Sequence, residues 1–129
     1  MTDPHILLLP GWKNSDAGHW QSRWEALYRD RRVEQHEWLR PLRGDWSARL
    51  EDEVLAAPGP VVFAAHSLGC ILVAAWAAHS RNTHRVRGAL LVGLISCSAC
   101  LAHRALHCVG WQIGASYRVW FPHSAAMLS

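Results

Sequence analysis

The sequence predicts an α/β protein: an open parallel sheet with helices on both of its faces. Three short apolar runs, at residues 5–9, 61–66 and 86–93, have the composition of strands that are buried on both sides. Segments with helical periodicity lie between them, and glycine or proline ends several of the elements. Strands that alternate with helices are usually parallel neighbours joined by right-handed crossovers, so this order predicts one α/β domain.

The first strand, "HILLL", ends at Pro10-Gly11 and leads into a predicted helix. Ser15 or Asp16 is in place to cap that helix. Its apolar stripe has the spacing of a helix lying on a sheet and is formed by Trp20, Trp24, Leu27 and Tyr28. The following "RRVEQHEW" is a weaker strand that ends before Pro41.

A second helix is predicted from its expected cap, Asp45, to the turn at Pro58-Gly59-Pro60. Its apolar stripe is formed by Trp46, Leu50 and Val54. "VVFAAH" at 61–66 is the strongest strand because it is β-branched, aromatic and without formal charge. Residues 68–79 are apolar almost all round, which predicts a buried helix, and residues 86–93 form a fourth strand.

The character of the sequence changes after Gly93. All ten Asp and Glu residues lie between Asp3 and Glu53, and the last part of the chain has no sustained period. We therefore divide the chain into an α/β domain, 1–92, and an atypical C-terminal segment, 93–129. The predicted sheet is truncated or altered after its fourth strand.

The composition of the 129-residue chain excludes several classes of protein. The net charge of +3 is spread along the sequence, without the basic stripe that is typical of nucleic-acid binding. No apolar run approaches the about 18 residues of a membrane span, and the opening residues lack the basic start of a signal peptide. We expect a cytoplasmic protein without a cofactor, whose partner is a small molecule and not a nucleic acid or a membrane.

Residues 65–69, "AHSLG", lie between the strongest strand and the buried helix and fit a small-x-Ser-x-small pattern. This is a relaxed form of the nucleophile elbow, a sharp strand-to-helix turn that presents a strained serine between small residues. Ser67 is the candidate nucleophile, and the N–H of Leu68 is a candidate oxyanion donor. The backbone N–H of Trp12, after the first strand, is the candidate second donor. The alternatives are that Ser67 only caps the helix and that Trp12 only packs under its loop.

Four segments follow one another in unbroken order: "LLLPGWKNSDAGHWQSRWE", "RVEQHEWLRP", "PGPVVFAAHSLGCILVAAWA" and "VRGALLV". Together they resemble the small α/β-hydrolases related to retinoblastoma-binding protein nine, over about residues 5–92. The resemblance implies an α/β-hydrolase fold and serine hydrolase activity, with esterase-like turnover of a small ester-like substrate. It places Ser67 on the nucleophile and Gly11-Trp12 on the oxyanion loop. The C-terminal part of the chain does not match.

A catalytic serine needs a base to accept its proton and a third group to orient that base. In this fold both partners follow the serine along the chain, yet no Asp or Glu follows Ser67. A complete triad in the usual order is therefore impossible, and we expect impaired activity.

Three explanations stay open for the missing acid. In the first, the C-terminal segment is not the family's own sequence, for instance because a shifted reading frame replaced it. In the second, the chain is a non-catalytic binding or interaction protein on the same fold. In the third, His19, oriented by Asp16, replaces the base. The alternative role for these two residues is as a cap and a first-turn residue of the helix that follows.

Two further expectations concern the tail and the sheet edge. Five suitable zinc ligands lie close together: Cys97, Cys100, His103, His107 and Cys108. Their halves are too near each other for the usual zinc-finger spacing, so we expect no metal. A fifth strand is one interpretation of "YRVWF". Without its proper neighbour the strand at 86–93 exposes an apolar edge, which predicts self-association.

Overall fold

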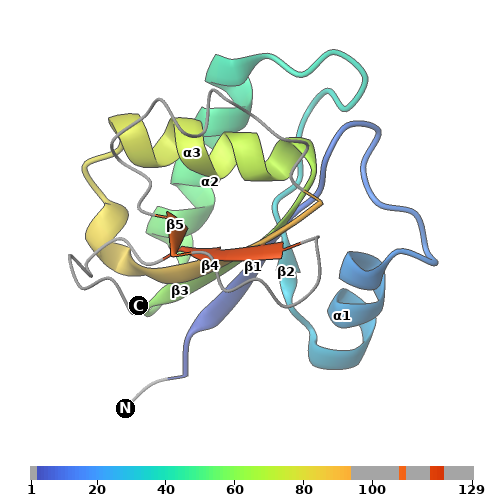
Figure 1. The fold of residues 1–129 in the computed structure, drawn as a ribbon, viewed down its shortest axis with the longest axis horizontal. Helices are drawn as coiled ribbons and strands as arrows, with labels where there is room; N and C mark the ends of the chain where they lie inside the picture. The colour runs from blue at the N-terminus through green and yellow to red at the C-terminus, as the bar shows by residue number, and fades with distance from the viewer. Residues whose placement is uncertain (1–2, 94–107, 110–116, 121–129) are drawn as a thin grey trace.

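The computed structural model describes residues 3–93, 108–109 and 117–120 and shows the predicted α/β fold (Figure 1). The strands of its single sheet are β1 (His5–Leu9), β2 (Arg31–Arg32), β3 (Val61–His66), β4 (Val86–Val92), β5 (Cys108–Val109) and β6 (Tyr117–Trp120). The helices are α1 (Trp20–Tyr28), α2 (Arg43–Ala56) and α3 (Leu68–His79), with a 3-10 turn, η1, at Thr83–Arg85. None of these helices in the described residues is long and apolar enough to cross a membrane.

The strands lie in the order β2-β1-β3-β4-β6-β5. Strands β1 to β4 are parallel, as predicted, whereas β6 and β5 are antiparallel to their neighbours at one end of the sheet. The strand suggested in "YRVWF" is present as β6 and pairs with β4 from Ala89 to Val92. The expectation of an unpartnered β4 edge is wrong over these residues, because β6 takes up the backbone groups that an edge strand leaves open. Self-association of the chain stays a prediction.

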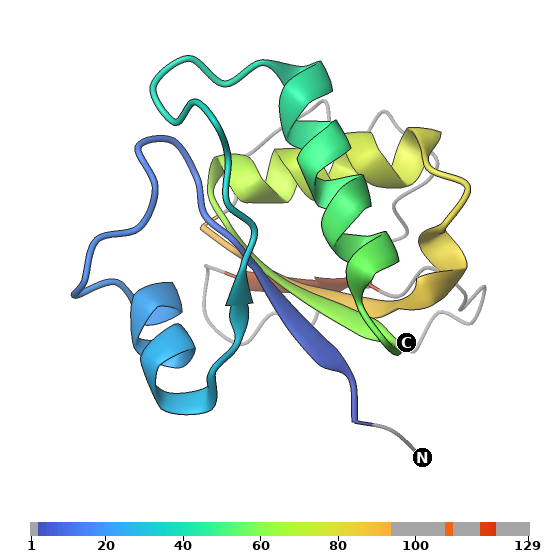
Figure 2. The same cartoon turned by 180° about the vertical axis from the view of Figure 1, so that it is seen from behind.

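The position of β1 between β2 and β3 determines where a site can form. The crossovers on either side of β1 run in opposite directions. As a result α1 lies on one side of the sheet and α2 and α3 lie together on the other (Figure 1 and Figure 2). In open α/β sheets, ligands bind at such a switch point, outside the carboxyl ends of the strands. The turns after β1 and β3, which carry Trp12 and Ser67, are at this position.

The main core lies between the sheet and the layer of α2 and α3. The stripe predicted for α2 is confirmed, since Trp46, Leu50 and Val54 are buried. Phe63 of β3 meets Trp76 of α3 edge to face, with 5.2 Å between the ring centroids. Each fully buried large apolar side chain contributes about 1.5–3 kcal/mol, so this layer supplies much of the stability.

Helix α1 differs from the prediction. Leu27 and Tyr28, which were expected in its apolar stripe, are 69% and 68% exposed, and the fully buried residue is the polar Gln21. The two predicted caps are also wrong: the N-cap is His19, whose Nδ1 accepts a hydrogen bond from the N–H of Gln21 at 3.2 Å. The apolar stripe does not predict which residues of α1 are buried, because this helix is anchored to the sheet through the hydrogen bonds of Gln21 that are described below.

Two other boundaries shift for local reasons. Helix α2 begins at Arg43, before the predicted cap Asp45, because Leu42 already has the extended conformation of an N-cap. Asp45 instead lies in the first turn, where its negative charge interacts favourably with the helix dipole. Strand β2 is confined to Arg31–Arg32 and does not reach Trp38, because β1 pairs with these two residues alone.

Candidate active site

Ser67 occupies the sharp turn between β3 and α3. Its torsion angles are φ 53° and ψ −116°, a conformation that costs a residue with a side chain on the order of 1–3 kcal/mol. Ser67 stands at the N-cap position, yet its side chain makes no capping hydrogen bond to α3. A strained backbone and a hydroxyl that does not cap the helix are typical of a presented nucleophile.

Two glycines allow the backbone to close around Ser67. A methyl group on Gly69 would lie 2.2 Å from the carbonyl oxygen of Leu9, so only glycine fits where α3 begins against the end of β1. A methyl group on Gly11 would lie 3.1 Å from Cβ of Ser67 and 3.2 Å from the backbone nitrogen of Leu68. The loop after β1 therefore lies directly against the elbow.

The two candidate oxyanion donors lie on either side of this contact. Leu68 is the first residue of α3, so its N–H has no partner within the helix. The side chain of Trp12 is 55% exposed and does not pack under its loop; its Nε1 donates to the carbonyl of Leu39 at 3.0 Å. The N–H of Lys13 donates to the carbonyl of Trp38 at 3.2 Å. These two bonds fasten the loop after β1 to the segment before α2.

The end of β4 supports the elbow from the other side. The N–H of Ser67 donates to the carbonyl of Val92 at 3.0 Å, and the N–H of Cys70 donates to the carbonyl of Ser67 at 2.9 Å. Gly93 has φ +70°, and a methyl group there would lie 3.3 Å from Nε2 of His66. The last residue of β4 thus holds the strained serine, and Gly93 just after it leaves space beside His66.

His66 and His19 form a pair of neighbouring rings that no sequence pattern connects. Their centroids are 4.4 Å apart at an interplanar angle of 73°. Burial lowers the pKa of His66, and the neighbouring His19 lowers it further. Burial also lowers the pKa of His19, although Asp16 acts in the opposite direction and Arg32 reinforces the effect. Both imidazoles are therefore neutral at neutral pH.

The geometry of His19 argues against its role as a substitute base. Its Nδ1 already accepts the N–H of Gln21, so the neutral ring carries its proton on Nε2 and has no free acceptor nitrogen. Asp16 accepts a hydrogen bond from the N–H of Gly18 at 3.1 Å and makes none to His19. Both residues have structural roles, as the other interpretation expected, but in different positions: His19 is the cap, and Asp16 stabilises the turn before it.

No orienting acid is present beside the serine in residues 3–93. Within that range no carboxylate makes a hydrogen bond or ion pair with Ser67, His66 or His19. The candidate zinc ligands lie outside the described residues, apart from the backbone of Cys108. In the part of the chain that the structure describes, no three His, Cys, Asp or Glu side chains are grouped to hold a metal.

The serine hydrolase family model matches residues 6–108 of the chain. The chain belongs to the serine hydrolase family. A protein of Pectobacterium atrosepticum named as a YdeN-like hydrolase has a similar crystal structure, with 28% sequence identity and a TM-score of 0.62. The similarity covers 67% of this chain and 46% of that protein, so this chain spans less than half of its relative's length. No curated protein matches the chain. A specific relationship to retinoblastoma-binding protein nine stays a prediction.

A cleft of about 610 Å³ also lies between α2 and α3, and Ser67 does not line it. The cleft contains the Glu51 carboxylate, which accepts hydrogen bonds from Asn82 Nδ2, Ser80 Oγ and Trp76 Nε1. Burial would raise the pKa of Glu51, but these three bonds outweigh it and lower the pKa. At the rim, Arg43 Nη2 lies 3.2 Å from His79 Nε2. Glu51 is thus already engaged in three hydrogen bonds, and Ser67 stays the candidate active-site residue.

Proposed function

We propose that Ser67 is the nucleophile of an esterase-like reaction that passes through an acyl-serine. Its Oγ attacks the carbonyl carbon of a small ester and loses its proton to water, while the alcohol leaves as its anion. A second water then releases the acid and restores the serine hydroxyl. The observation that carries this proposal is the elbow itself: a strained Ser67 that does not cap α3, enclosed by Gly11 and Gly69.

The oxyanion that forms during the attack would be stabilised by two backbone donors. The N–H of Leu68 lies at the start of α3, where the helix dipole also favours negative charge. The N–H of Trp12 follows Gly11, whose backbone lies against the elbow. Removing one donor of this kind typically slows a hydrolase by about 10²–10³-fold.

The missing acid limits the range of esters. His66 and His19 have no carboxylate partner among the described residues, so no oriented base or general acid is in place there. The alcohol must then leave largely as an anion, which favours activated esters with acidic leaving groups such as p-nitrophenol. An oxyanion site and substrate binding alone leave a residual rate about 10³–10⁴-fold above water.

A non-catalytic binding protein on the same fold is the second candidate. The observation that favours it is the absence of any Asp or Glu after Glu53. In that case the elbow would be an inherited feature of the family and the serine would not react.

A fluorophosphonate probe, which forms a covalent bond with activated serines, separates the two candidates. We expect labelling of the wild type and of the control Ser47→Ala, which removes a half-buried serine hydroxyl from α2. Ser67→Ala should not be labelled, and mass spectrometry should find the adduct on Ser67 of the wild type. Absence of a Ser67 adduct in folded wild-type protein would exclude the nucleophile and leave the binding protein.

A further inference from the structure

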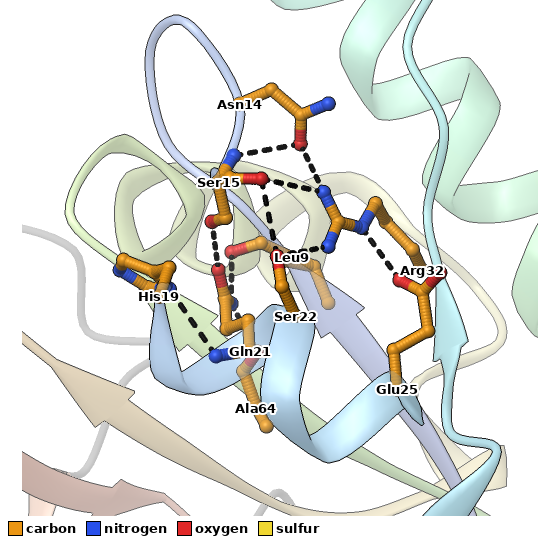
Figure 3. Close-up of polar contacts among 9 residues, drawn as sticks. All are labelled: Leu9, Asn14, Ser15, His19, Gln21, Ser22, Glu25, Arg32 and Ala64. Atoms are coloured by element: carbon orange, nitrogen blue, oxygen red, sulfur yellow. Dashed lines mark hydrogen bonds and ion pairs between the residues drawn. The ribbon is translucent and has the colours of Figure 1, made fainter. Parts of the chain in front are cut away.

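Gln21 is the one fully buried residue of α1, and its side-chain amide joins separate parts of the chain (Figure 3). Its Nε2 donates to the carbonyl of Leu9 and to the carbonyl of Ala64, both at 2.9 Å. Its Oε1 accepts the hydroxyl of Ser15 at 2.7 Å. One amide thus connects the end of β1, the middle of β3 and the loop between β1 and α1.

Ser15 is itself held firmly at this point of the loop. Its carbonyl accepts hydrogen bonds from Ser22 Oγ at 3.1 Å and from Arg32 Nη1 at 3.0 Å. Its N–H donates to Asn14 Oδ1 at 2.8 Å, and the same oxygen accepts from Arg32 at 2.7 Å. Figure 3 shows these groups converging on Ser15 from α1 and β2. The loop is therefore fixed to Gln21 and is not free to slide past it.

From these contacts we infer that Gln21 is a positioning residue that sets the spacing between the oxyanion loop and Ser67. Leu9 lies just before Gly11 and Trp12, and Ser15 lies just after them, so Gln21 holds both ends of the segment that carries the donor. Ala64 leads directly along β3 to the elbow. This inference rests on the proposed function, because it assigns the spacing to the reaction of Ser67.

The arrangement exceeds what is needed to bury a glutamine. A buried amide without partners is costly, and a single partner on one strand would relieve much of that cost. Here the amide has three partners on three separate segments: the end of β1, the strand that leads to Ser67, and the loop that follows Trp12. Displacements of about 1 Å that originate away from the reacting atoms can slow an enzyme by about 10²-fold.

The first test compares two serine variants that each remove a partly buried hydroxyl. Ser15→Ala removes the bond to Gln21. The control Ser80→Ala removes the 2.8 Å bond to Glu51 and the 3.0 Å bond from the N–H of Asn82, both at the far end of α3. Fluorophosphonate labelling is measured over a range of probe concentrations. We expect Ser15→Ala to lower the maximal labelling rate roughly tenfold with little change in apparent probe affinity. Equal rates in the two variants, or rates that follow melting temperature, would overturn the inference.

The second test adds a pH readout that a purely structural role would not produce. In Gln21→Glu an ionised carboxylate cannot donate to the carbonyls of Leu9 and Ala64, whereas the protonated acid can donate to one of them. We expect labelling slowed about 10²-fold at pH 8 and a deficit, relative to wild type, that shrinks as pH falls. Gln21→Met has no donor at any pH and should show no such recovery. Identical pH profiles for the two variants would count against the role of the amide.

Amide hydrogen exchange separates this inference from the proposed function. If the wild type is not labelled, the proposed nucleophile fails, and exchange of the peptide spanning residues 10–19 decides the positioning role. Faster exchange of this peptide in Ser15→Ala, but not in Ser80→Ala, supports the positioning role of Gln21. Unchanged exchange in Ser15→Ala overturns it. If the wild type is labelled and both serine variants react alike, the function stands and the positioning role fails.

Discussion

The two ends of helix α3 face polar clusters of opposite character. At its start, Ser67 lies against the backbone of Gly11 and Val92, and the neighbouring ring of His66 packs on His19. Near its end, Ser80 and Trp76 bind the Glu51 carboxylate. The first cluster lowers the pKa values of His19 and His66 and so favours their neutral forms. The second lowers the pKa of Glu51 and so favours its charged form.

This difference indicates a division of tasks along α3. Where little side-chain charge is present, fixed N–H dipoles are the main electrostatic feature, as stabilisation of an oxyanion requires. Such a site depends on close backbone contacts, so its geometry is sensitive to a single added methyl group. The cluster around Glu51 depends on side-chain hydrogen bonds. Substitutions there should mainly change the stability of the protein and its loss at low pH.

The largest expected effect comes from a methyl group at the start of α3. Gly69→Ala places Cβ 2.2 Å from the Leu9 carbonyl oxygen, which we expect to cost about 3 kcal/mol and to abolish labelling of Ser67. The matched control is Gly44→Ala at the start of α2, where nothing lies within 4 Å. It should be neutral or stabilising by about 0.5–1 kcal/mol. Urea denaturation of both variants measures the contrast, and similar losses would contradict it.

A smaller effect should reveal the strain at Ser67 directly. Ser67→Gly and Ser67→Ala both lack the hydroxyl, but only glycine accepts φ 53° without strain. We expect the glycine variant to be more stable than the alanine variant by about 1 kcal/mol in urea denaturation. At Ser80, where φ is −74°, the order should reverse, because glycine there brings only extra freedom to the unfolded chain. Glycine and alanine variants of equal stability at position 67 would show that the elbow is unstrained.

The sequence predicted the elements whose signal is local. The uncharged run of β3, the all-round apolar α3 and the stripe of α2 were found because burial leaves a direct imprint on composition. The sharp turn at Ser67 was also accessible, because its small-x-Ser-x-small pattern lies within five residues, although the carbonyl of Leu9 on β1 is what requires glycine at 69. In each case one segment contains the whole signal.

The features that the sequence did not reveal depend on distant partners. Gln21 looked like one polar position on a helix with an apolar stripe, yet its burial is stabilised by the carbonyl of Ala64, 43 residues away. The contact of His19 with His66 arises only when α1 packs beside the end of β3. The pairing of β6 with β4 likewise depends on a strand whose sequence alone is short and ambiguous.

The cluster around Glu51 should affect the stability of the protein at low pH. Because the folded pKa of Glu51 is lowered, its contribution to stability is present above the ordinary value of 4.5 and is lost as pH falls through the folded pKa. We expect Glu51→Gln to lose about 1 kcal/mol at pH 7 and to show a weaker further loss in acid than wild type. Asp52→Asn is the matched control, since Asp52 is 70% exposed and only 3.9 Å from Arg49 in a weak ion pair. Parallel acid profiles for the wild type and Glu51→Gln would remove the special role of Glu51.

The smallest effect should come from the neutral cluster at the other end of α3. The folded pKa values of His66 and His19 lie below the ordinary value of 6.5, so their contribution is complete above pH 6.5 and is lost as pH falls through the folded values. His19→Asn keeps a side-chain acceptor for the N–H of Gln21 but removes one of the paired rings. Its melting temperature at pH 7.5 should stay within about 2 °C of wild type, and its fall between pH 7.5 and pH 5 should be smaller. An equal or steeper fall in the variant would mean that the folded protein does not lower the pKa of His19. The contrast between the two ends of α3 would then lose one of the two imidazoles on which it rests.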